Sequence, residues 1–325
     1  MKAIIVDQPG GADVLTLRDV PAPAFNDRQV LVEVAYCGCN WADTQIRAGT
    51  YPHRVGFPVI LGFEVSGVVR EVGDRVSRFS PGDRVCAIVD GGGYSEQIAI
   101  DEDRLIAVPD DVDLDVAAAF PIQALTAYHM LHTIFGVAPG DTVLCHAVGG
   151  GVGLYVTQLA VAAGARVLGT VGTPGKETLA LQYGAERVVN TKAEDFVAAA
   201  HEFTQGRGID LTIDSLGANT LDRSFSVMRN LGHVISIGEA EGEPFLNIRE
   251  RILPKSLSFT RFHLLHVDLN GPAWTEGVAA VMQAVTSGQV QVPIVHRFPL
   301  REAADMHRLL EGRSVAGKLL LSARD

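Results

Sequence analysis

A glycine-rich turn in the second half of the chain is the segment best suited to bind a ligand's phosphates. Residues 146 to 153 read HAVGGGVG, between an apolar run at residues 142 to 145 and a helical pattern that extends to residue 163. Glycine lacks the Cβ atom that would keep a pyrophosphate away from the backbone, and the N-terminus of a helix attracts negative charge. Val148 stands where a G-x-G-x-x-G motif would have its first glycine. The order of strand, turn and helix therefore carries the prediction of a dinucleotide site, with a purely structural turn as the alternative. The backbone expected to hold the pyrophosphate belongs to Gly150, Gly151, Val152 and Gly153.

The end of the next expected strand indicates which dinucleotide would bind. An NAD site usually carries an acidic residue about 20 residues further on, which bonds the ribose 2′-hydroxyl. Residues 170 to 176 read TVGTPGK and offer Gly172, the Thr173 hydroxyl and the Lys176 ammonium, but no carboxylate. Thr173 and Lys176 can accommodate a 2′-phosphate, so the sequence predicts NADPH. In the alternative, Lys176 is only a solvated helix residue and Glu177 recognises the ribose.

Two patterns of secondary structure position this turn. Up to about residue 110, short β-branched runs are separated by Gly, Pro and Asp, which predicts a compact β domain. From about residue 140, apolar runs alternate with helix-length segments, which predicts an α/β fold with a parallel doubly wound sheet. The expected strands of that sheet are residues 142 to 145, 166 to 170, 188 to 189, 209 to 213, 233 to 236 and 256 to 262. Two helical stretches, residues 274 to 287 and 301 to 310, precede a last strand at residues 318 to 321.

Such a sheet binds its ligand at the carboxyl ends of its strands. This rule adds Ser215, Ile237 and Gly238 to the expected neighbours of the cofactor. No long polar linker separates the two halves, so we expect them to pack closely with a ligand cleft between them.

Composition narrows the class of protein. The chain has 325 residues and a net charge of 27 − 38 = −11, which disfavours a nucleic-acid partner. Two uncharged spans, residues 116 to 139 and 142 to 165, contain proline, histidines or three consecutive glycines and do not resemble helices that face lipid. An acidic residue is reached at position 7, before any apolar signal segment develops, so no export signal is expected. Four scattered cysteines favour a reducing, cytoplasmic setting.

Three segments are similar to motifs of a known family. Residues 62 to 73 read GFEVSGVVREVG and residues 82 to 85 read GDRV, similar to a G-H-E signature with its V-G and G-D-x-V elements. Residues 40 to 52 read NWADTQIRAGTYP, similar to N-x-x-D-x-x-x-R-x-G-x-Y-P, and residues 146 to 153 are similar to H-A-A-x-G-G-V-G. Together they resemble the zinc-independent, zeta-crystallin-like quinone oxidoreductase group of the medium-chain dehydrogenase/reductase superfamily. The resemblance spans almost the whole chain. It implies a GroES-like β-rich catalytic domain at residues 1–122 and 266–325 and a Rossmann domain at residues 123–265.

Departures from the superfamily's pattern narrow the chemistry. Zinc-dependent relatives place a cysteine and a histidine ligand where this chain has Asn40 and Phe63, and Cys37 and Cys39 are expected to be buried rather than to bind metal. No metal site is therefore expected. Alcohol oxidation needs a group that stabilises an alkoxide, whereas a quinone or a conjugated C=C spreads the incoming charge onto its own oxygen. The prediction is NADPH-dependent reduction of a quinone or an α,β-unsaturated carbonyl.

The resemblance also assigns individual residues. Asn40 would donate to the substrate oxygen, with a loop-capping role as its alternative, and Tyr51 would bond that oxygen or pass a proton, or else only pack. Thr126 would lie beside the nicotinamide amide, or be a buried helical threonine. The remaining assignments to the cofactor are Asn190, Thr191 and Lys318, where Lys318 could also be an ordinary surface lysine.

Several supporting roles and rival functions complete the expectations. Asp43 and Arg47, four residues apart, are expected to form a local ion pair that supports the Asn40 loop, and His146 is expected under the cofactor turn. The edge strand at residues 256 to 262 predicts a homodimer. One rival is an enoyl-thioester reductase acting on a CoA- or ACP-linked chain. The other is a non-catalytic NADPH-binding protein with a structural, regulatory or RNA-binding role.

Overall fold

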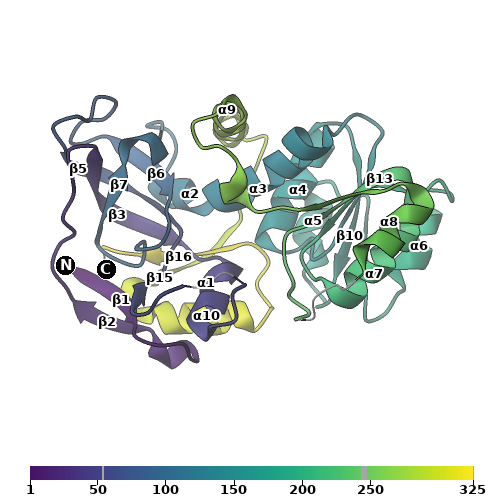
Figure 1. Cartoon of the computed structure of the whole chain (residues 1–325), viewed down its shortest axis with the longest axis horizontal. Coiled ribbons are helices and arrows are strands. Elements are labelled where there is room, and N and C mark those ends of the chain that lie inside the picture. The colour runs from purple at the N-terminus through teal and green to yellow at the C-terminus, as the bar shows by residue number, and fades with distance from the viewer. Residues whose placement is uncertain (53–54, 243–246, 325) are drawn as a thin grey trace. The chain divides into compact units, whose positions relative to one another are not determined.

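The computed structural model describes residues 1–52, 55–242 and 247–324 (Figure 1). Contacts between Cα atoms divide the chain into two compact units. Unit 1 consists of Met1–Ile122 together with Val292–Asp325, and unit 2 is Gln123–Gln291. Each unit is described by itself below.

Unit 1 is built on antiparallel β-structure. A seven-stranded sheet has the order β15-β16-β3-β5-β6-β8, with β7 also paired to β3, and a three-stranded sheet has the order β2-β1-β4. The strands are β1 (Lys2–Val6), β2 (Thr16–Asp19), β3 (Gln29–Gly38), β4 (Val59–Ile60), β5 (Glu64–Val72), β6 (Arg84–Ile88), β7 (Gln97–Asp101), β8 (Leu105–Ala107), β15 (Ile294–Pro299) and β16 (Lys318–Ser322). The helices are α1 (Trp41–Ala48), α2 (Leu114–Ala119) and α10 (Ala303–Glu311).

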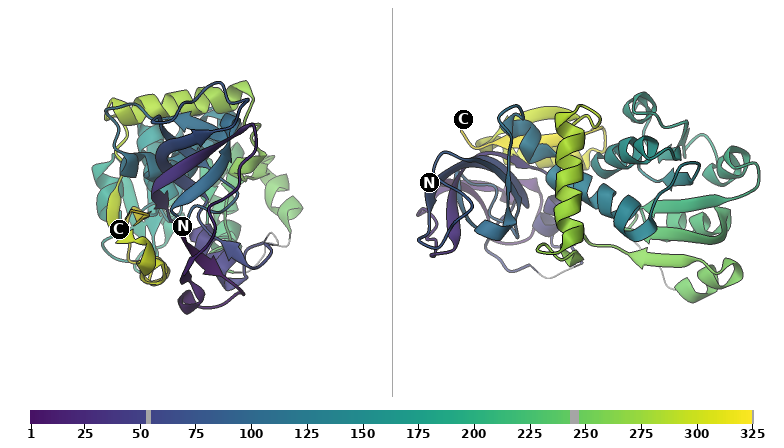
Figure 2. Two further views of the ribbon diagram at one scale, coloured as in Figure 1. Left: turned by 90° about the vertical axis from the view of Figure 1, so that its left-hand side faces the viewer. Right: turned by 90° about the horizontal axis from the view of Figure 1, so that it is seen from above.

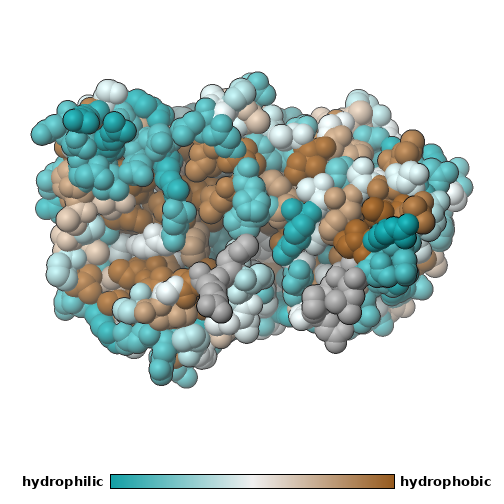
Figure 3. Space-filling view, viewed as in Figure 1, coloured by the Kyte–Doolittle hydropathy of each residue, from teal (hydrophilic) through white to brown (hydrophobic). Residues whose placement is uncertain are grey.

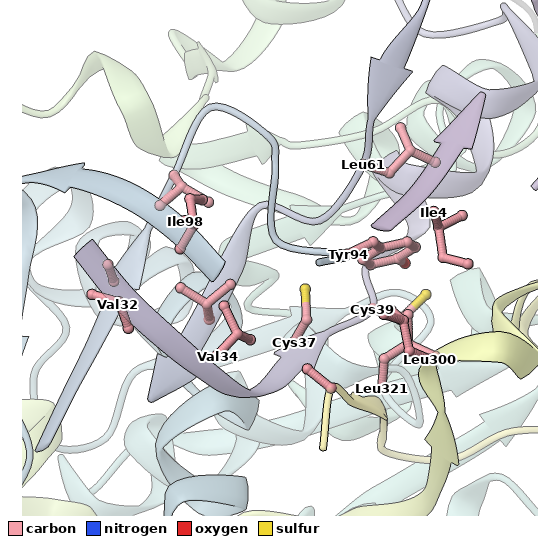
Figure 4. Close-up of a cluster of buried hydrophobic side chains, with 14 of the residues drawn as sticks. Ile4, Val32, Val34, Cys37, Cys39, Leu61, Tyr94, Ile98, Leu300 and Leu321 are labelled. Atoms are coloured by element: carbon pink, nitrogen blue, oxygen red, sulfur yellow. The ribbon is translucent and has the colours of Figure 1, made fainter. Parts of the chain in front are cut away.

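The core of unit 1 explains why its strands are so apolar. Strand β3 pairs with β16, β5 and β7 and contacts α2, and most of its side chains are buried, with Glu33 exposed. Figure 4 shows Ile4, Leu61 and Cys39 around the ring of Tyr94 in this core. The Tyr94 hydroxyl lies 3.0 Å from Nε2 of His307, and this hydrogen bond ties helix α10 to the core.

Unit 2 is a doubly wound parallel sheet. Its six strands have the order β11-β10-β9-β12-β13-β14 and all neighbours are parallel. Helices cover both faces of the sheet (Figures 1 and 2). The strands are β9 (Thr142–Cys145), β10 (Arg166–Val171), β11 (Arg187–Asn190), β12 (Ile209–Asp214), β13 (Met228–Ser236) and β14 (Ser258–Arg261). The helices are α3 (Pro121–Tyr128), which starts in unit 1, a π-helix (His129–Phe135), α4 (Gly151–Ala162), α5 (Glu177–Gln182), α6 (Phe196–Phe203), α7 (Ala218–Val227), α8 (Ile248–Ile252) and α9 (Pro272–Thr286).

The predicted alternation of strands and helices in this half is confirmed, with one clear difference in extent. Strand β13 begins at Met228, five residues before the predicted start at residue 233. The added residues include Leu231 at a positive φ of 60° and Gly232, a composition that does not indicate a strand. Pairing of Met228 with Ile209 of β12 holds this first part of the strand in the sheet.

The segment at residues 266–291 groups with unit 2, whereas the sequence analysis placed it in the first domain. Helix α9 stacks Trp274 on His129, with ring centroids 5.9 Å apart. At the end of the segment, the side chain of Gln158 accepts from the backbone N–H of Gln291 at 2.7 Å and donates to its carbonyl at 3.1 Å. These contacts join distant parts of the chain, so the sequence of the segment alone does not show which unit it packs on.

No helix in the described parts of the chain has both the length and the apolar character needed to span a bilayer. Figure 3 shows hydrophilic and apolar residues interspersed over the visible face.

Candidate functional site

The glycine turn of unit 2 presents a helix N-terminus without a side-chain cap. Strand β9 ends at Cys145, Ala147 adopts a positive φ of 52°, and α4 begins at Gly151 with Gly150 as its N-cap residue. Because the N-cap residue is glycine, it has no side chain that could accept from the first amides of α4. The first N–H groups of a helix lack partners within the helix, so this turn offers backbone donors and the positive end of a helix dipole to an anion.

Two of the predicted glycines lie where a Cβ atom would approach neighbouring atoms of unit 2 too closely. A Cβ atom on Gly153 would lie 2.7 Å from the Cα and from the carbonyl oxygen of Val148, both of which are backbone atoms. A Cβ atom on Gly151 would collide with the side-chain amide of Gln123. Both glycines therefore allow helix α4 to pack closely on its surroundings, a role that the sequence pattern does not separate from ligand binding.

The other two glycines of the turn differ in their surroundings. A Cβ atom on Gly149 would collide with the backbone carbonyl of Lys176. The loop that carries Lys176 thus packs directly on the turn. The loop predicted to bind the 2′-phosphate and the turn predicted to bind the pyrophosphate are therefore neighbours. Gly150 meets only the Ala147 carbonyl, 3.1 Å from a built Cβ. Gly150 is therefore the glycine of this turn that packing explains least and for which ligand access is the better reason.

His146 supports this turn from below as a neutral, fully hydrogen-bonded side chain. Ser224 donates its hydroxyl to the Thr220 carbonyl at 2.7 Å, so its oxygen accepts from Nε2–H of His146 at 2.8 Å. Nδ1 of His146 then accepts from the Thr170 hydroxyl at 2.9 Å. Burial, with a contribution from Arg223, lowers the pKa of His146 to about 3. The expected place under the turn is observed, and the histidine links β9, β10 and α7.

The predicted residues at the carboxyl ends of β10 and β11 are brought side by side. Val171 pairs with Asn190 in the sheet register, so Gly172 follows directly beside this pair. Both the backbone N–H and the hydroxyl of Thr191 donate to the Val171 carbonyl, at 2.9 and 3.3 Å. Asn190 accepts from the Lys192 N–H at 3.1 Å.

The loops after β12 and β13 also lie together. Ile237 donates its N–H to the Asp214 carbonyl at 2.8 Å, and a Cβ atom on Gly238 would lie 2.7 Å from the Ser215 carbonyl. Ser215, Ile237 and Gly238 thus share the carboxyl edge of the sheet, as the strand-end rule expects.

Asp214, which the sequence analysis did not select, is the most unusual acid at this edge. Its Oδ1 accepts from the Gly217 N–H at 2.8 Å, while Oδ2 is buried and has no hydrogen-bond partner among the described residues. Burial is the main cause that raises the pKa of Asp214, to about 7. The sequence signal that would have pointed to it is an aspartate at a strand end followed by S-L-G, a turn that needs an acceptor for its N–H groups.

In unit 1, Asn40 belongs to a buried polar cluster with Glu64 and Lys318. Asn40 is 7% exposed, Glu64 0% and Lys318 1%. Oε1 of Glu64 accepts from Nζ of Lys318 and from Nδ2 of Asn40, the latter at 2.8 Å. Nζ of Lys318 also donates to Oδ1 of Asn40 at 2.9 Å. The alternative that Lys318 is an ordinary surface lysine is wrong, and Glu64 is a member of the cluster that the sequence analysis missed.

The predicted ion pair between Asp43 and Arg47 is also wrong. Asp43 accepts from the N–H groups of Asn40 at 2.8 Å and Gly62 at 3.0 Å, while Arg47 donates to both carboxyl oxygens of Glu311, at 3.1 and 2.6 Å. Asp43 occupies the third position of α1 and completes a capping box with Asn40, so its side chain turns back to the helix start. Burial raises the pKa of Asp43 to about 7. Asp43 still supports the Asn40 loop, but through backbone amides.

The other expected residues of the site have simpler surroundings. Tyr51 is half-buried and packs against the core of unit 1, and Thr126 is 8% exposed in α3. Cys37 and Cys39 are buried, and burial raises the pKa of both thiols. In the part of the chain that the structure describes, no three His, Cys, Asp or Glu side chains gather into a possible metal site.

Comparison with known proteins places this geometry in a family. A model described as zinc-binding dehydrogenase matches residues 151–288, and a model described as alcohol dehydrogenase GroES-like domain matches residues 26–110. A 2-haloacrylate reductase from Burkholderia sp is 35% identical over 326 residues, covering 98% of each chain. Quinone oxidoreductase 1 of Escherichia coli strain K12 is 35% identical over 319 residues, covering 96% of each.

A solved structure agrees with these matches. Escherichia coli quinone oxidoreductase complexed with NADPH superimposes with a TM-score of 0.94 at 32% identity, over 99% of this chain and 100% of that chain. The fold is therefore that of a medium-chain dehydrogenase/reductase, with a GroES-like β-rich domain and a Rossmann domain, as expected. The chain belongs to the quinone oxidoreductase group of that superfamily.

Asp210 and Asp214, near the two ends of strand β12, should change the free energy of unfolding with pH in opposite directions. Because the pKa of Asp214 is raised from 3.8 to about 7, its contribution to stability is fully present below pH 4 and is lost as the pH rises through 7. Asp214→Asn keeps an acceptor for the Gly217 N–H and removes the titration. We expect the free energy of unfolding of the wild type to fall relative to this variant, by up to about 4 kcal/mol between pH 4 and 8. Urea unfolding at a series of pH values measures the difference.

Asp210 at the start of the same strand is the matched control. It is 2% exposed, and hydrogen bonds from Arg207 and Arg229 hold its pKa below the usual range in spite of burial. Asp210→Asn should therefore lose a constant amount of stability from pH 5 to 8, and the loss should shrink only in more acidic solution. Parallel curves for wild type and Asp214→Asn would contradict the role given to Asp214.

Proposed function

We propose that this protein is an NADPH-dependent oxidoreductase that reduces quinones or α,β-unsaturated carbonyls by hydride transfer without a catalytic metal. The observation that carries the proposal is whole-chain similarity to quinone oxidoreductases, together with an uncapped helix N-terminus at the glycine turn. The relative that is named for 2-haloacrylate, an unsaturated acid, favours C=C reduction as well as quinone reduction.

The residues of unit 2 fit NADPH. The α4 N-terminus and Gly150, where a Cβ atom would meet only the Ala147 carbonyl, suit the pyrophosphate, and the Lys176 loop that packs on the turn suits the 2′-phosphate. The carboxyl edge adds the remaining contacts that we assign to the cofactor. They come from Gly151, Val152, Gly153, Gly172, Thr173, Asn190, Thr191, Ser215, Ile237 and Gly238. When bound, NADPH supplies the hydride.

The acceptor needs little assistance from the protein. Conjugation moves the arriving negative charge onto the acceptor's oxygen, so one or two hydrogen-bond donors and correct positioning are sufficient. We assign the donor role to the Asn40 amide and the Tyr51 hydroxyl, and we assign Thr126 to the nicotinamide amide. Asn40 and Phe63 replace the ligand types of zinc-dependent relatives, and the Lys318 ammonium already neutralises Glu64, both of which support chemistry without a metal.

We also propose a cytoplasmic homodimer. Among the described residues, strand β14 pairs only with β13, so its other edge could accept a strand from a second copy of the chain. All four cysteines are buried thiols, as suits a reducing compartment.

Acceptor specificity tests the proposed function directly. NADPH oxidation by purified protein should be faster with 9,10-phenanthrenequinone or a simple enone than with crotonyl-CoA, by about tenfold or more in kcat/KM, because a quinone absorbs charge without help. Treatment with a chelator should not change the rate. Preference for crotonyl-CoA would favour the enoyl-thioester reductase, and NADPH binding with no turnover of any acceptor would favour a non-catalytic protein.

Removing the Lys176 ammonium tests the choice of coenzyme. Lys176→Ala should raise KM for NADPH by about tenfold, the value of one charge-assisted hydrogen bond to a phosphate. NADH lacks the 2′-phosphate and serves as the control, so its KM should stay within about twofold. Equal KM values for NADPH in wild type and variant would remove the assignment.

The glycine turn offers a matched pair of variants. Gly150→Ala adds a Cβ atom 3.1 Å from the Ala147 carbonyl, a milder contact than at Gly153, so we expect a weakened NADPH Kd, by about tenfold, with a smaller loss of stability than in Gly153→Ala. Gly153→Ala places its Cβ atom against the Val148 backbone and should lower stability by about 1–3 kcal/mol. Fluorescence titration and thermal unfolding separate the two effects. A Gly150→Ala protein with wild-type affinity would argue against a pyrophosphate at this position.

A further inference from the structure

The buried cluster of Asn40, Glu64 and Lys318 contains a charge pair that the proposed reaction does not use directly. Lys318 and Glu64 are 254 residues apart in the chain and meet at the first residues of strands β16 and β5. Moving two charges out of water is unfavourable, and the attraction between them compensates only when further hydrogen bonds complete the site. A fully buried pair at this place therefore calls for an explanation other than stability.

Every oxygen of the Glu64 carboxylate is used. Oε1 accepts from Lys318 and Asn40, and Oε2 accepts from the Ile122 N–H at 2.8 Å. Gly38 makes room for this side chain, since a Cβ atom there would lie 2.7 Å from Oε1 of Glu64 and 2.5 Å from the Ala118 carbonyl. The surroundings thus provide hydrogen-bond donors for both carboxylate oxygens and, at Gly38, the space that the side chain needs.

The pair holds the Asn40 amide at both ends. The amide oxygen faces the Lys318 ammonium, a donor that cannot accept, and the amide nitrogen faces the Glu64 carboxylate, an acceptor that cannot donate. Rotation of the amide by 180° would place oxygen against carboxylate and N–H against ammonium. The charges therefore select one orientation of the amide and prevent the other.

The same carboxylate also fixes the start of helix α3. Ile122 is the second residue of α3, where N–H groups have no partner within the helix, and Glu64 supplies an anionic acceptor. Helix α3 carries Thr126, the residue assigned to the nicotinamide amide. One buried acid thus contacts both the amide of Asn40 and the first turn of the helix that carries Thr126.

We propose that Glu64 and Lys318 are positioning residues that orient the Asn40 amide as a hydrogen-bond donor to the acceptor's oxygen. The inference rests on the proposed function, because it assumes that Asn40 serves the acceptor. It assigns Lys318 to this cluster and not to the cofactor, where the family resemblance placed it. Neither residue touches the reacting atoms.

A double-mutant cycle tests the inference. Glu64→Gln with Lys318→Met removes both charges together, so neither charge is left buried and unpaired. We expect kcat to fall by about 100-fold in this paired variant and by about 100-fold in Asn40→Ala, the usual effect of removing one oriented donor. The kcat of the variant with all three substitutions should lie within about threefold of the kcat of the paired variant and of Asn40→Ala, because the pair acts through Asn40. The NADPH Kd should stay within about threefold of wild type in every variant.

Further measurements distinguish a positioning role from other roles. Glu64→Gln alone keeps a hydrogen-bond acceptor for Lys318 and Asn40 but leaves the Lys318 ammonium without a counterion, so we expect a lower Tm than in the paired variant together with a smaller loss of kcat. Lys255→Met is the control for loss of a hydrogen-bonded lysine, since Lys255 in unit 2 donates to the carbonyls of Ser226 and Met228 at 2.7 Å, and its kcat should be unchanged. Circular dichroism and Tm report the folded fraction, to which every kcat is referred.

Four outcomes would overturn the inference. Additive losses in the triple variant would show that the pair acts independently of Asn40. A raised NADPH Kd with normal kcat would make Lys318 a cofactor ligand, and a lowered Tm with normal kcat would make the pair merely structural. Full activity of Asn40→Ala would show that the Asn40 amide is not the hydrogen-bond donor to the acceptor's oxygen. These results differ from a failure of the proposed function, in which the wild type reduces no quinone or enone at all.

Discussion

The buried attraction between Glu64 and Lys318 is the interaction on which unit 1 depends. It joins strands that lie far apart in sequence, and it fixes the donor loop and the first turn of α3 through hydrogen bonds to the same carboxylate. A hydrophobic pair could fill this volume with a lower desolvation cost. What it could not supply is a direction for the neighbouring amide. The desolvation cost of the buried pair is thus consistent with the proposed role of the pair in orienting the Asn40 amide.

The glycine turn of unit 2 shows a different division of tasks. A Cβ atom on Gly149 or Gly153 would meet backbone atoms at 2.3 and 2.7 Å, whereas on Gly151 it would meet the end of the Gln123 side chain and on Gly150 only the Ala147 carbonyl, at 3.1 Å. Gly149 and Gly153 therefore serve the packing of the Lys176 loop and of helix α4, and Gly150 is the position that we assign to the ligand. The same close packing explains why His146 below the turn is neutral and held by two hydroxyl groups.

Sequence reasoning succeeded where a local pattern determines the structure. The parallel strands of unit 2 follow from short apolar runs spaced by helices, and strand-end residues such as Ser215 and Gly238 meet because parallel strands end at one edge. It failed where the partner is distant. The sequence assigned Lys318 to the cofactor, with a surface lysine as the alternative, and only the fold brings Glu64 against it. Spacing alone suggested that Asp43 pairs with Arg47, but helix capping and Glu311 compete more strongly for the two side chains. Asp214 escaped notice because burial, which sequence does not report, sets its pKa.

The route of the chain through unit 1 has a consequence for its assembly on the ribosome. All of unit 2 is synthesised before Val292, while the strands β15 and β16 that complete the seven-stranded sheet come after it. Until Lys318 emerges, the Glu64 carboxylate has no counterion and the nascent N-terminal sheet cannot close around it. We therefore expect the interior segment to fold first and the earliest-made residues to finish last, an order opposite to the usual N-to-C progression of domains during translation.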